Sequence, residues 1–337
     1  MRRFWSQTEP YLFLVIVAVT LLIQVISGQF YTPNNITDIL RSLIIPGLFS
    51  IGVMMVIVSG GVDVSFPAIG ALAMYVVVAV QRGNGHGGSV LLGYLAAMGI
   101  GLLVGMLNGF IIAKYNMPTL IVSLGTSSLC IGIMQGVLKG HEIPLPANIL
   151  AFGKLKFFTA ANSVSGLTSD MPLTFAFLVI AVGIAYILLN HTMLGRGVYA
   201  VGGDPQAASR AGFNVFFTRM FLYSFVGVLA GFTGYTRAIV TLNCQPVNLI
   251  GTELNVIAGV VLGGVRITGG VGTLKGTILG TLLLTTINNS LIMLGIPTIW
   301  QSISIAVFIL VGTGISSIQA EMVKKNRMIS LSRRDAA

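Results

Sequence analysis

The sequence has little charge for its length. Only 8% of its 337 residues are Asp, Glu, Lys or Arg, whereas soluble domains average about 25%. Apolar residues make up 55% of the chain, and the mean hydropathy is +0.92. Water is therefore not the main solvent of the folded chain, and the sequence predicts an all-α integral membrane protein in contact with the lipid bilayer.

Acidic residues are scarcer than basic ones, with nine Asp and Glu against 19 Lys and Arg. The basic residues lie in short loops and tails between apolar runs and form no patch, which favours membrane orientation over nucleic-acid binding. The candidate intramembrane acidic residues are Asp63, after the second run, and Glu253, at the edge of the eighth, and neither lies at mid-membrane. Because so few ionisable groups lie near the membrane interior, the sequence argues against transport coupled to an ion gradient. An ion-coupled secondary transporter or facilitator stays as the alternative, because backbone carbonyls can hold sodium.

Groups that could carry catalysis are also sparse. The three histidines fall in separate loops, and the two cysteines lie in an apolar run (Cys130) and a polar loop (Cys244), so we expect them to be unpaired. The nearest approach to a phosphate-binding loop, 269–276, has glycine after Lys275 where Ser or Thr would hold magnesium. We therefore expect no catalytic residue, no metal site and no enzyme activity on this chain.

Apolar runs of membrane length dominate what is present. They predict about ten transmembrane helices in a polytopic bundle, over residues 11–29, 43–59, 66–81, 88–113, 118–138, 171–190, 214–235, 253–265, 273–293 and 297–316. The eighth run is short. With the N-terminus inside, 13 of the 19 basic residues fall on the inner side, so the positive-inside rule places both termini in the cytoplasm.

The spans form a single transmembrane domain, 1–337, and short polar segments lie between them and at the two ends. The expected segments are a cytoplasmic N-terminus (1–10), an external loop (139–170), a cytoplasmic loop (191–213) and a cytoplasmic tail (317–337). In the second half of 191–213, Asp204 before Pro205 predicts a helix start. Ala207, Ala208 and Ala211 then follow on one side of that helix.

Glycine recurs at helix-packing intervals. Gly101, Gly105 and Gly109 form one ladder, Gly272, Gly276 and Gly280 form another, and Gly227 and Gly231 make a single step. Such spacing lets helix backbones approach closely where lipid provides no hydrophobic drive. The ladders predict helix packing and no chemistry.

Two glycine-rich turns interrupt the apolar runs, at 59–65 (Ser-Gly-Gly-Val-Asp-Val-Ser) and 262–272. One interpretation is a tight turn with Asp63 capping the next helix. The other is a gate beside a translocation path, since irregular backbone at membrane depth can line a cavity. The candidate path or gate residues are Ser59, Gly60, Gly61, Asp63, Asn108, Asn255, Gly263 and Gly264.

The sequence resembles the permease subunits of bacterial ABC importers for ribose, galactose and related sugars. The resemblance covers nearly the whole chain and rests on four segments, at 59–65, 116–126, 194–212 and 253–264 with the following Gly-Gly-Val-Gly. The chain departs from the family pattern at Phe66-Pro67, at Arg266 and at Asp204, where asparagine is common. The resemblance implies a ten-helix permease fold in the bacterial inner membrane, which forms the path for a small polar solute, and it favours a monosaccharide as that solute.

The resemblance also implies partners. These are cytoplasmic ABC ATPase subunits that hold ATP and magnesium, a periplasmic or surface solute-binding protein facing loop 139–170, and a second copy of the permease or a paralogous one. No cofactor is expected on this chain. The loop at 191–213 would be the coupling loop that docks on the ATPase, through Gly202, Gly203, Asp204, Ala207, Ala208, Arg210 and Gly212.

Overall fold

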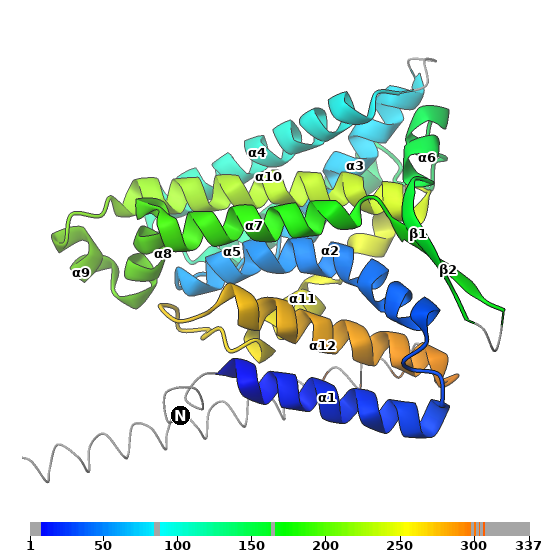
Figure 1. Cartoon of the computed structure of the whole chain (residues 1–337). Helices are drawn as coiled ribbons and strands as arrows, with labels where there is room; N and C mark the ends of the chain where they lie inside the picture. Colours follow the sequence, from blue (N-terminus) through cyan, green and yellow to red (C-terminus); the bar gives the residue numbers. More distant parts are fainter. Residues whose placement is uncertain are drawn as a thin grey trace, which may run out of the picture.

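The computed structural model describes residues 8–83, 88–162 and 166–297, together with 300, 303 and 306. The first seven residues, the predicted cytoplasmic tail (317–337) and nearly all of the tenth predicted span (297–316) lie outside the described residues. The described chain is almost entirely helical (Figure 1).

Long helices occupy most of the predicted spans, and shorter elements lie between them. The long helices are α1 (Thr8–Ser27), α2 (Pro33–Val58), α3 (Phe66–Gly83), α4 (Val90–Tyr115), α5 (Thr119–Gly132, extended by a π-helix, Ile133–Val137), α7 (Phe175–His191), α10 (Val215–Thr241) and α12 (Leu274–Met293). The shorter ones are α6 (Ala147–Gly153), β1 (Lys156–Ala161), β2 (Thr168–Pro172), α8 (Met193–Gly203), α9 (Pro205–Arg210), a 3₁₀-helix (Pro246–Leu249) and α11 (Glu253–Leu262).

Seven of the described helices are long and apolar enough to cross a membrane, or eight if α7 and α8, which are bent by 72° at their junction, form one broken span. The eighth predicted span, 253–265, is represented by the ten-residue α11. At 1.5 Å per residue this helix extends roughly 15 Å, half of the ~30 Å hydrocarbon core. Among the described residues the structure therefore shows a polytopic helical membrane protein, and the count of ten stays a prediction.

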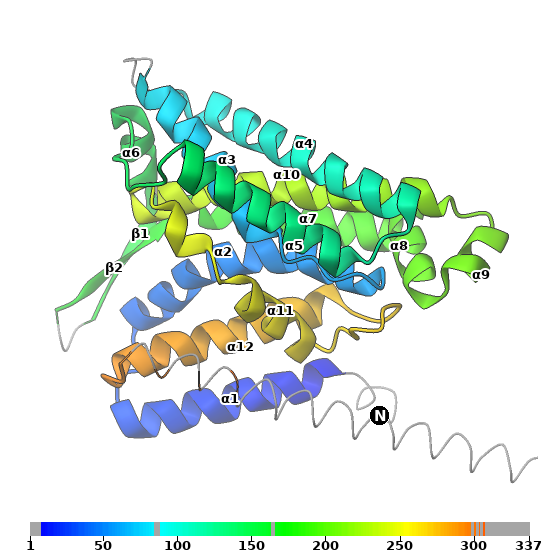
Figure 2. The same ribbon diagram turned by 180° about the vertical axis from the view of Figure 1, so that it is seen from behind.

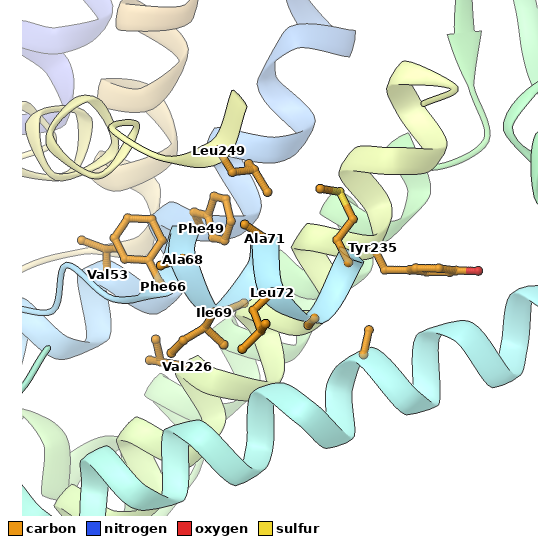
Figure 3. Packing of buried hydrophobic residues seen from close by; sticks show 14 of the residues in the cluster. Phe49, Val53, Phe66, Ala68, Ile69, Ala71, Leu72, Val226, Tyr235 and Leu249 are labelled. Atoms are coloured by element: carbon orange, nitrogen blue, oxygen red, sulfur yellow. The ribbon is translucent and has the colours of Figure 1, made fainter. Parts of the chain in front are cut away.

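Helix α2 lies at the centre of the bundle. Its second half is buried on all sides, and Leu48, Ile51, Met54 and Met55 have no exposed surface. Both views place α12 along α2, and α1 along α12 on the outside (Figures 1 and 2). In the core, Phe49 of α2 packs on Phe66 at the start of α3, with ring centroids 4.9 Å apart (Figure 3).

The predicted glycine ladders are confirmed as sites of close helix contact, except at Gly272, which lies in the loop before α12. A Cβ atom on Gly101 or Gly227 would overlap the carbonyl oxygen of the other glycine, so α4 and α10 touch backbone to backbone. Gly276 and Gly280 of α12 approach the carbonyl oxygens of Gly263 and Gly259 in the same way. This packing is available because glycine has no side chain to hold the helices apart.

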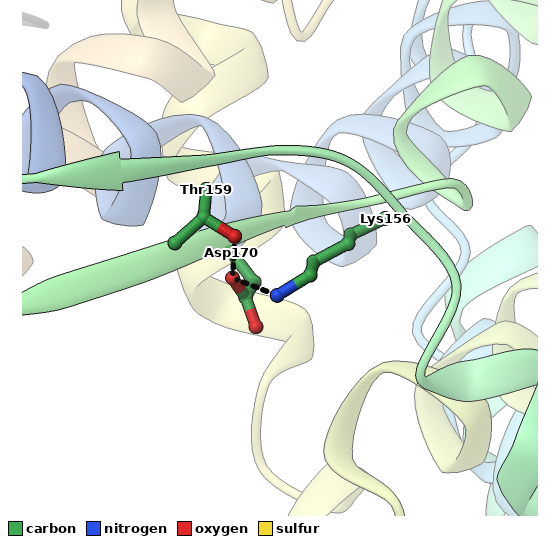
Figure 4. Close-up of polar contacts among 3 residues, drawn as sticks. All are labelled: Lys156, Thr159 and Asp170. Carbon is green, nitrogen blue, oxygen red and sulfur yellow. Dashed lines mark hydrogen bonds and ion pairs between the residues drawn. The ribbon is translucent and has the colours of Figure 1, made fainter.

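The predicted external loop, 139–170, is more ordered than its polar sequence indicated. It contains α6 and the antiparallel β1–β2 hairpin, so the described chain is not wholly α-helical. On the hairpin, Asp170 accepts hydrogen bonds from Thr159 (2.6 Å) and Lys156 (3.0 Å) (Figure 4). Ser169 donates to Asp38 of α2 at 2.8 Å. The hairpin and the start of α2 therefore form one end of the molecule, called here the hairpin end, opposite α8 and α9 (Figure 1).

Candidate functional site

Three glycine-rich segments meet near the α9 end of the molecule. The turn after α2 contributes Gly60, the end of α8 contributes Gly202, and the loop between α11 and α12 contributes Gly269 and Gly270. We call these four residues the glycine junction. A Cβ atom on Gly269 would lie 2.6 Å from the carbonyl oxygen of Gly202 and 2.8 Å from Cα of Gly60. Only glycine lets the three backbones meet at this distance.

The glycine junction is also fixed by hydrogen bonds and backbone conformation. Gly270 donates its amide to the carbonyl oxygen of Val58 at 2.8 Å, and Tyr199 of α8 donates its hydroxyl to the carbonyl oxygen of Gly272 at 2.9 Å. Gly60, Gly269 and Gly270 have φ values of 82°, 88° and 74°, which L-residues with a side chain rarely adopt. Helix α8 is thus attached to the end of α2 and to the α11–α12 loop.

The predicted helix after Asp204 is present as α9. Asp204 is its N-cap and accepts hydrogen bonds from the amides of Gln206 (2.8 Å) and Ala207 (3.1 Å), with Pro205 in the first turn. Ala207 and Ala211 are exposed, whereas Ala208 is buried against the protein. The prediction that the three alanines share one side is therefore wrong for Ala208, which lies about 100° around the helix from Ala207.

The remaining predicted docking residues divide by environment. Gly203, Asp204, Arg210 and Gly212 are exposed, and Gly202 is buried in the glycine junction. The exposed surface of α9 is thus formed by Pro205, Gln206, Ala207, Ser209 and Arg210, and Ala208 is the buried residue of this helix. The exposed surface of α9 therefore lies only a few residues after Gly202, whose backbone contact is buried.

Asp63 is buried and lies in a polar chain that crosses three elements. Its Oδ1 accepts from the amide (2.7 Å) and the hydroxyl (2.6 Å) of Ser65 directly before α3. Asn108 of α4 donates to the Ser65 hydroxyl at 3.1 Å and accepts from Thr126 of α5. The capping interpretation of Asp63 is confirmed. Asp63 and Asn108 stabilise the turn and do not line a described cavity.

A polar cavity of about 520 Å³ lies between α2, α10, α11 and α12, in the half of the molecule nearer the hairpin. Its polar lining residues are Arg41, Ser42, Arg237, Thr241, Asn248, Thr252, Asn255, Thr281, Thr285, Asn288 and Asn289. Of the path residues predicted from the sequence, Asn255 alone lines this cavity. Ser59, Gly60 and Gly61 belong to the turn after α2, and Gly263 and Gly264 follow α11, with Gly263 packed on Gly276 of α12.

The two arginines of the cavity were not identified as site residues from the sequence. The predicted spans began at 43 and ended at 235, which placed Arg41 and Arg237 in external loops. In the structure α2 begins at Pro33 and α10 continues to Thr241, so both arginines lie within helices. A recognisable signal was present in α12, where Thr281, Thr285, Asn288 and Asn289 interrupt an apolar run at helical spacing.

Comparison with known proteins agrees with this architecture. A family model described as "Branched-chain amino acid transport system / permease component" matches residues 35–312. The ribose import permease protein RbsC of Escherichia coli K12 is 30% identical over 308 residues, which cover 91% of this chain and 92% of that protein. The corresponding Bacillus subtilis protein is 31% identical over 302 residues, covering 89% of each chain.

A relative named for another solute is similar to the same degree. The autoinducer 2 import system permease protein LsrC of Yersinia enterocolitica is 33% identical over 301 residues, covering 89% of this chain and 79% of that protein. No solved structure matches the chain. The long apolar helices, the glycine-packed core and a family match over most of the length lead to one conclusion: the chain is a multi-pass membrane protein that belongs to the family of branched-chain amino acid transport system permease components.

Proposed function

We propose that this chain is the membrane-spanning subunit of an ATP-driven, binding-protein-dependent importer for a monosaccharide or a similarly hydroxylated small solute. Similarity to the ribose and autoinducer 2 import permeases supports the importer. The cavity supports the solute class, because its volume of about 520 Å³ lies in the ~300–1,000 Å³ range of small-molecule sites. Its amides and hydroxyls can exchange hydrogen bonds with a polyhydroxylated molecule.

The proposal includes ten spans in the bacterial inner membrane with both termini in the cytoplasm. The distribution of basic residues supports this orientation. The α9 end then faces the cytoplasm and the hairpin end faces outward. Segments 1–10 and 317–337 are the cytoplasmic ends of the single permease domain, 191–213 is the coupling loop, and 139–170 is external.

The partners follow from this orientation. Cytoplasmic ABC ATPase subunits, which carry ATP and magnesium, dock on the exposed surface of α9, which includes Gln206, Ala207 and Arg210. A solute-binding protein delivers solute at the hairpin end, and a second copy of the permease or a paralogous chain completes the membrane unit. No cofactor is assigned to this chain itself.

The glycine junction is the observation that carries the proposal. Helix α8, which lies in the coupling loop directly before α9, contacts the end of α2 and the loop between α11 and α12 through backbone atoms. These same helices, α2, α11 and α12, form most of the cavity wall. Because tightly packed backbone atoms deform little, a displacement of α8 and α9 would be transmitted to the helices around the solute.

Reconstitution tests the proposed function. The full-length protein is placed in liposomes with the ATPase and binding protein encoded beside it, and uptake of labelled pentoses and hexoses is measured. We expect uptake that requires ATP on the side of the membrane where the ATPase is bound. Uptake should stop when the ATPase is omitted. Accumulation by this chain alone, driven by a sodium or proton gradient, would show the alternative, an ion-coupled transporter.

A further inference from the structure

We propose that the polar cavity takes a polyhydroxylated solute that carries one anionic group, as a sugar acid does, and that Arg237 recognises its charge. This inference rests on the proposed function and specifies the solute class of the same cavity. It is carried by the unbalanced charge of the cavity wall and by the hydrogen-bonding capacity left open beside it.

The charge of the cavity wall is positive. Arg41 and Arg237 both line it, and none of the cavity-lining residues in the described chain is acidic. Arg41 is partly compensated, since its Nη2 donates to the carbonyl oxygen of Val240 at 3.0 Å and its charge contributes to lowering the pKa of Asp170. Across the described residues, no carboxylate lies within ion-pair distance of Arg237.

An uncompensated guanidinium in a partly buried site costs free energy, because removal from water is repaid only by a counter-charge. The C-terminus of α10, which ends at Thr241 one turn after Arg237, supplies the equivalent of about −0.5 charge. That is too little to balance two cations. One negative charge on the solute would complete the balance, and a guanidinium fits a carboxylate with two parallel hydrogen bonds.

The neutral part of the wall presents acceptors for hydroxyl donors. Thr281 and Thr285 donate their hydroxyl protons to backbone carbonyls one turn earlier, each at 2.9 Å, so their oxygens stay available as acceptors. The buried Oδ1 of Asn288 has no hydrogen-bond partner among the described residues. Sugar hydroxyls would donate to the two threonine oxygens, and to Oδ1 of Asn288 once that buried side chain rotates toward the cavity, while the anionic group binds Arg237. A neutral sugar would leave the guanidinium uncompensated.

Two matched probe pairs test the inference. The full-length protein in lipid nanodiscs is titrated with galactose and galacturonate, and with glucose and glucuronate, with binding followed by saturation-transfer NMR. Within each pair the molecules differ only at C6, as a primary alcohol or a carboxylate. We expect at least one acid to bind about tenfold more tightly than its neutral partner, or about 1.4 kcal/mol. The preference should decrease as salt is raised.

Three variants separate recognition of charge from loss of folding. Arg237→Gln should make the acid and the neutral sugar bind equally, whereas Arg237→Lys should keep most of the preference because it keeps the charge. Lys275→Gln, an exposed basic residue at the other end of α12, should leave the preference unchanged. Equal binding within both pairs, binding of neither pair, or an Arg237→Gln protein that keeps the preference would overturn the inference. ATP-dependent uptake of a neutral sugar would still support the proposed function.

Discussion

The amide of Gly270 donates a 2.8 Å hydrogen bond to the carbonyl oxygen of Val58, the last residue of α2. The bond joins segments more than 200 residues apart in sequence, and Gly202 of α8 packs directly against the same carbonyl. The end of the central helix, the candidate coupling loop and the α11–α12 loop therefore share one carbonyl group.

Gly202→Ala should disrupt the glycine junction. The new methyl group would overlap the carbonyl oxygen of Val58, which is backbone and has no rotamer with which to move away. Overpacking of this kind costs about 1–3 kcal/mol, and we expect a lower apparent melting temperature and reduced ATP-dependent uptake. Gly203→Ala is the matched control, because a Cβ at the neighbouring position has no atom within 4 Å. Equal melting temperatures and equal uptake for the two variants would contradict the proposal that the glycine junction transmits movement from α8 to the cavity.

Ala207→Glu should uncouple ATP hydrolysis from uptake while leaving the fold intact. Ala207 is exposed on α9, so the substitution alters only the surface proposed to dock on the ATPase. The matched control is Asn190→Glu, at an exposed position of α7 outside the coupling loop and away from the hairpin end. ATPase activity and uptake are measured together in proteoliposomes. Normal uptake by Ala207→Glu would contradict the docking assignment, whereas Ala208→Glu is unsuitable because Ala208 is buried.

Asn108→Ala should destabilise the protein. The change removes the acceptor for Thr126 and the donor to Ser65, both in a buried chain of hydrogen bonds. An unsatisfied buried polar group costs about 1–3 kcal/mol, and thermal unfolding in detergent should show a lower transition temperature. Asn190→Ala provides the comparison, since Asn190 is exposed and its side chain contacts only the carbonyl oxygen of Tyr186. A similar shift in transition temperature for both variants would mean that the buried chain of hydrogen bonds adds nothing to the stability of the protein.

Gly101→Ala should separate α4 from α10. The added Cβ would overlap the carbonyl oxygen of Gly227 in the facing helix. Gly99→Ala, two residues earlier on α4, has no atom within 4 Å of the new Cβ and should gain up to about 1 kcal/mol from helix propensity. The two alanine variants should therefore shift the melting temperature in opposite directions. A higher melting temperature for both variants would indicate that α4 and α10 can move apart without loss of stability.

The hairpin should loosen at acidic pH. Hydrogen bonds from Thr159 and Lys156 hold the pKa of Asp170 below its usual range. A lowered folded-state pKa means that the stabilisation is fully present above the unfolded pKa and is lost as pH falls through the folded one. Amide hydrogen exchange in β1 and β2, corrected for intrinsic rates, should therefore accelerate below about pH 4. Asp170→Asn should remove this pH dependence, and an unchanged profile in that variant would exclude Asp170 as its source.

Much of the fold could be predicted from the sequence because lipid makes local composition decisive. Apolar runs must form helices to satisfy their own backbone groups, so the span over 66–81 corresponds closely to α3. The cap at Asp204 is equally local, since it depends on the next few residues alone. The glycine ladders indicated that close packing occurs, although nothing in their spacing named Gly227 as the partner of Gly101.

The candidate site depended on tertiary structure. Hydropathy ended the predicted spans at the first charged residue, so Arg41 and Arg237 were assigned to loops, although the helices continue past them and align both at one cavity. Asn108 was expected beside a path and instead holds a turn. Local sequence is sufficient to predict the membrane environment, the helical segments and the caps, because these depend on composition and on residues within a turn or two of each other. Which glycines meet, and which polar groups face a shared cavity, follows from the packing of helices that are distant along the chain, and the sequence of any one helix carries no information about it.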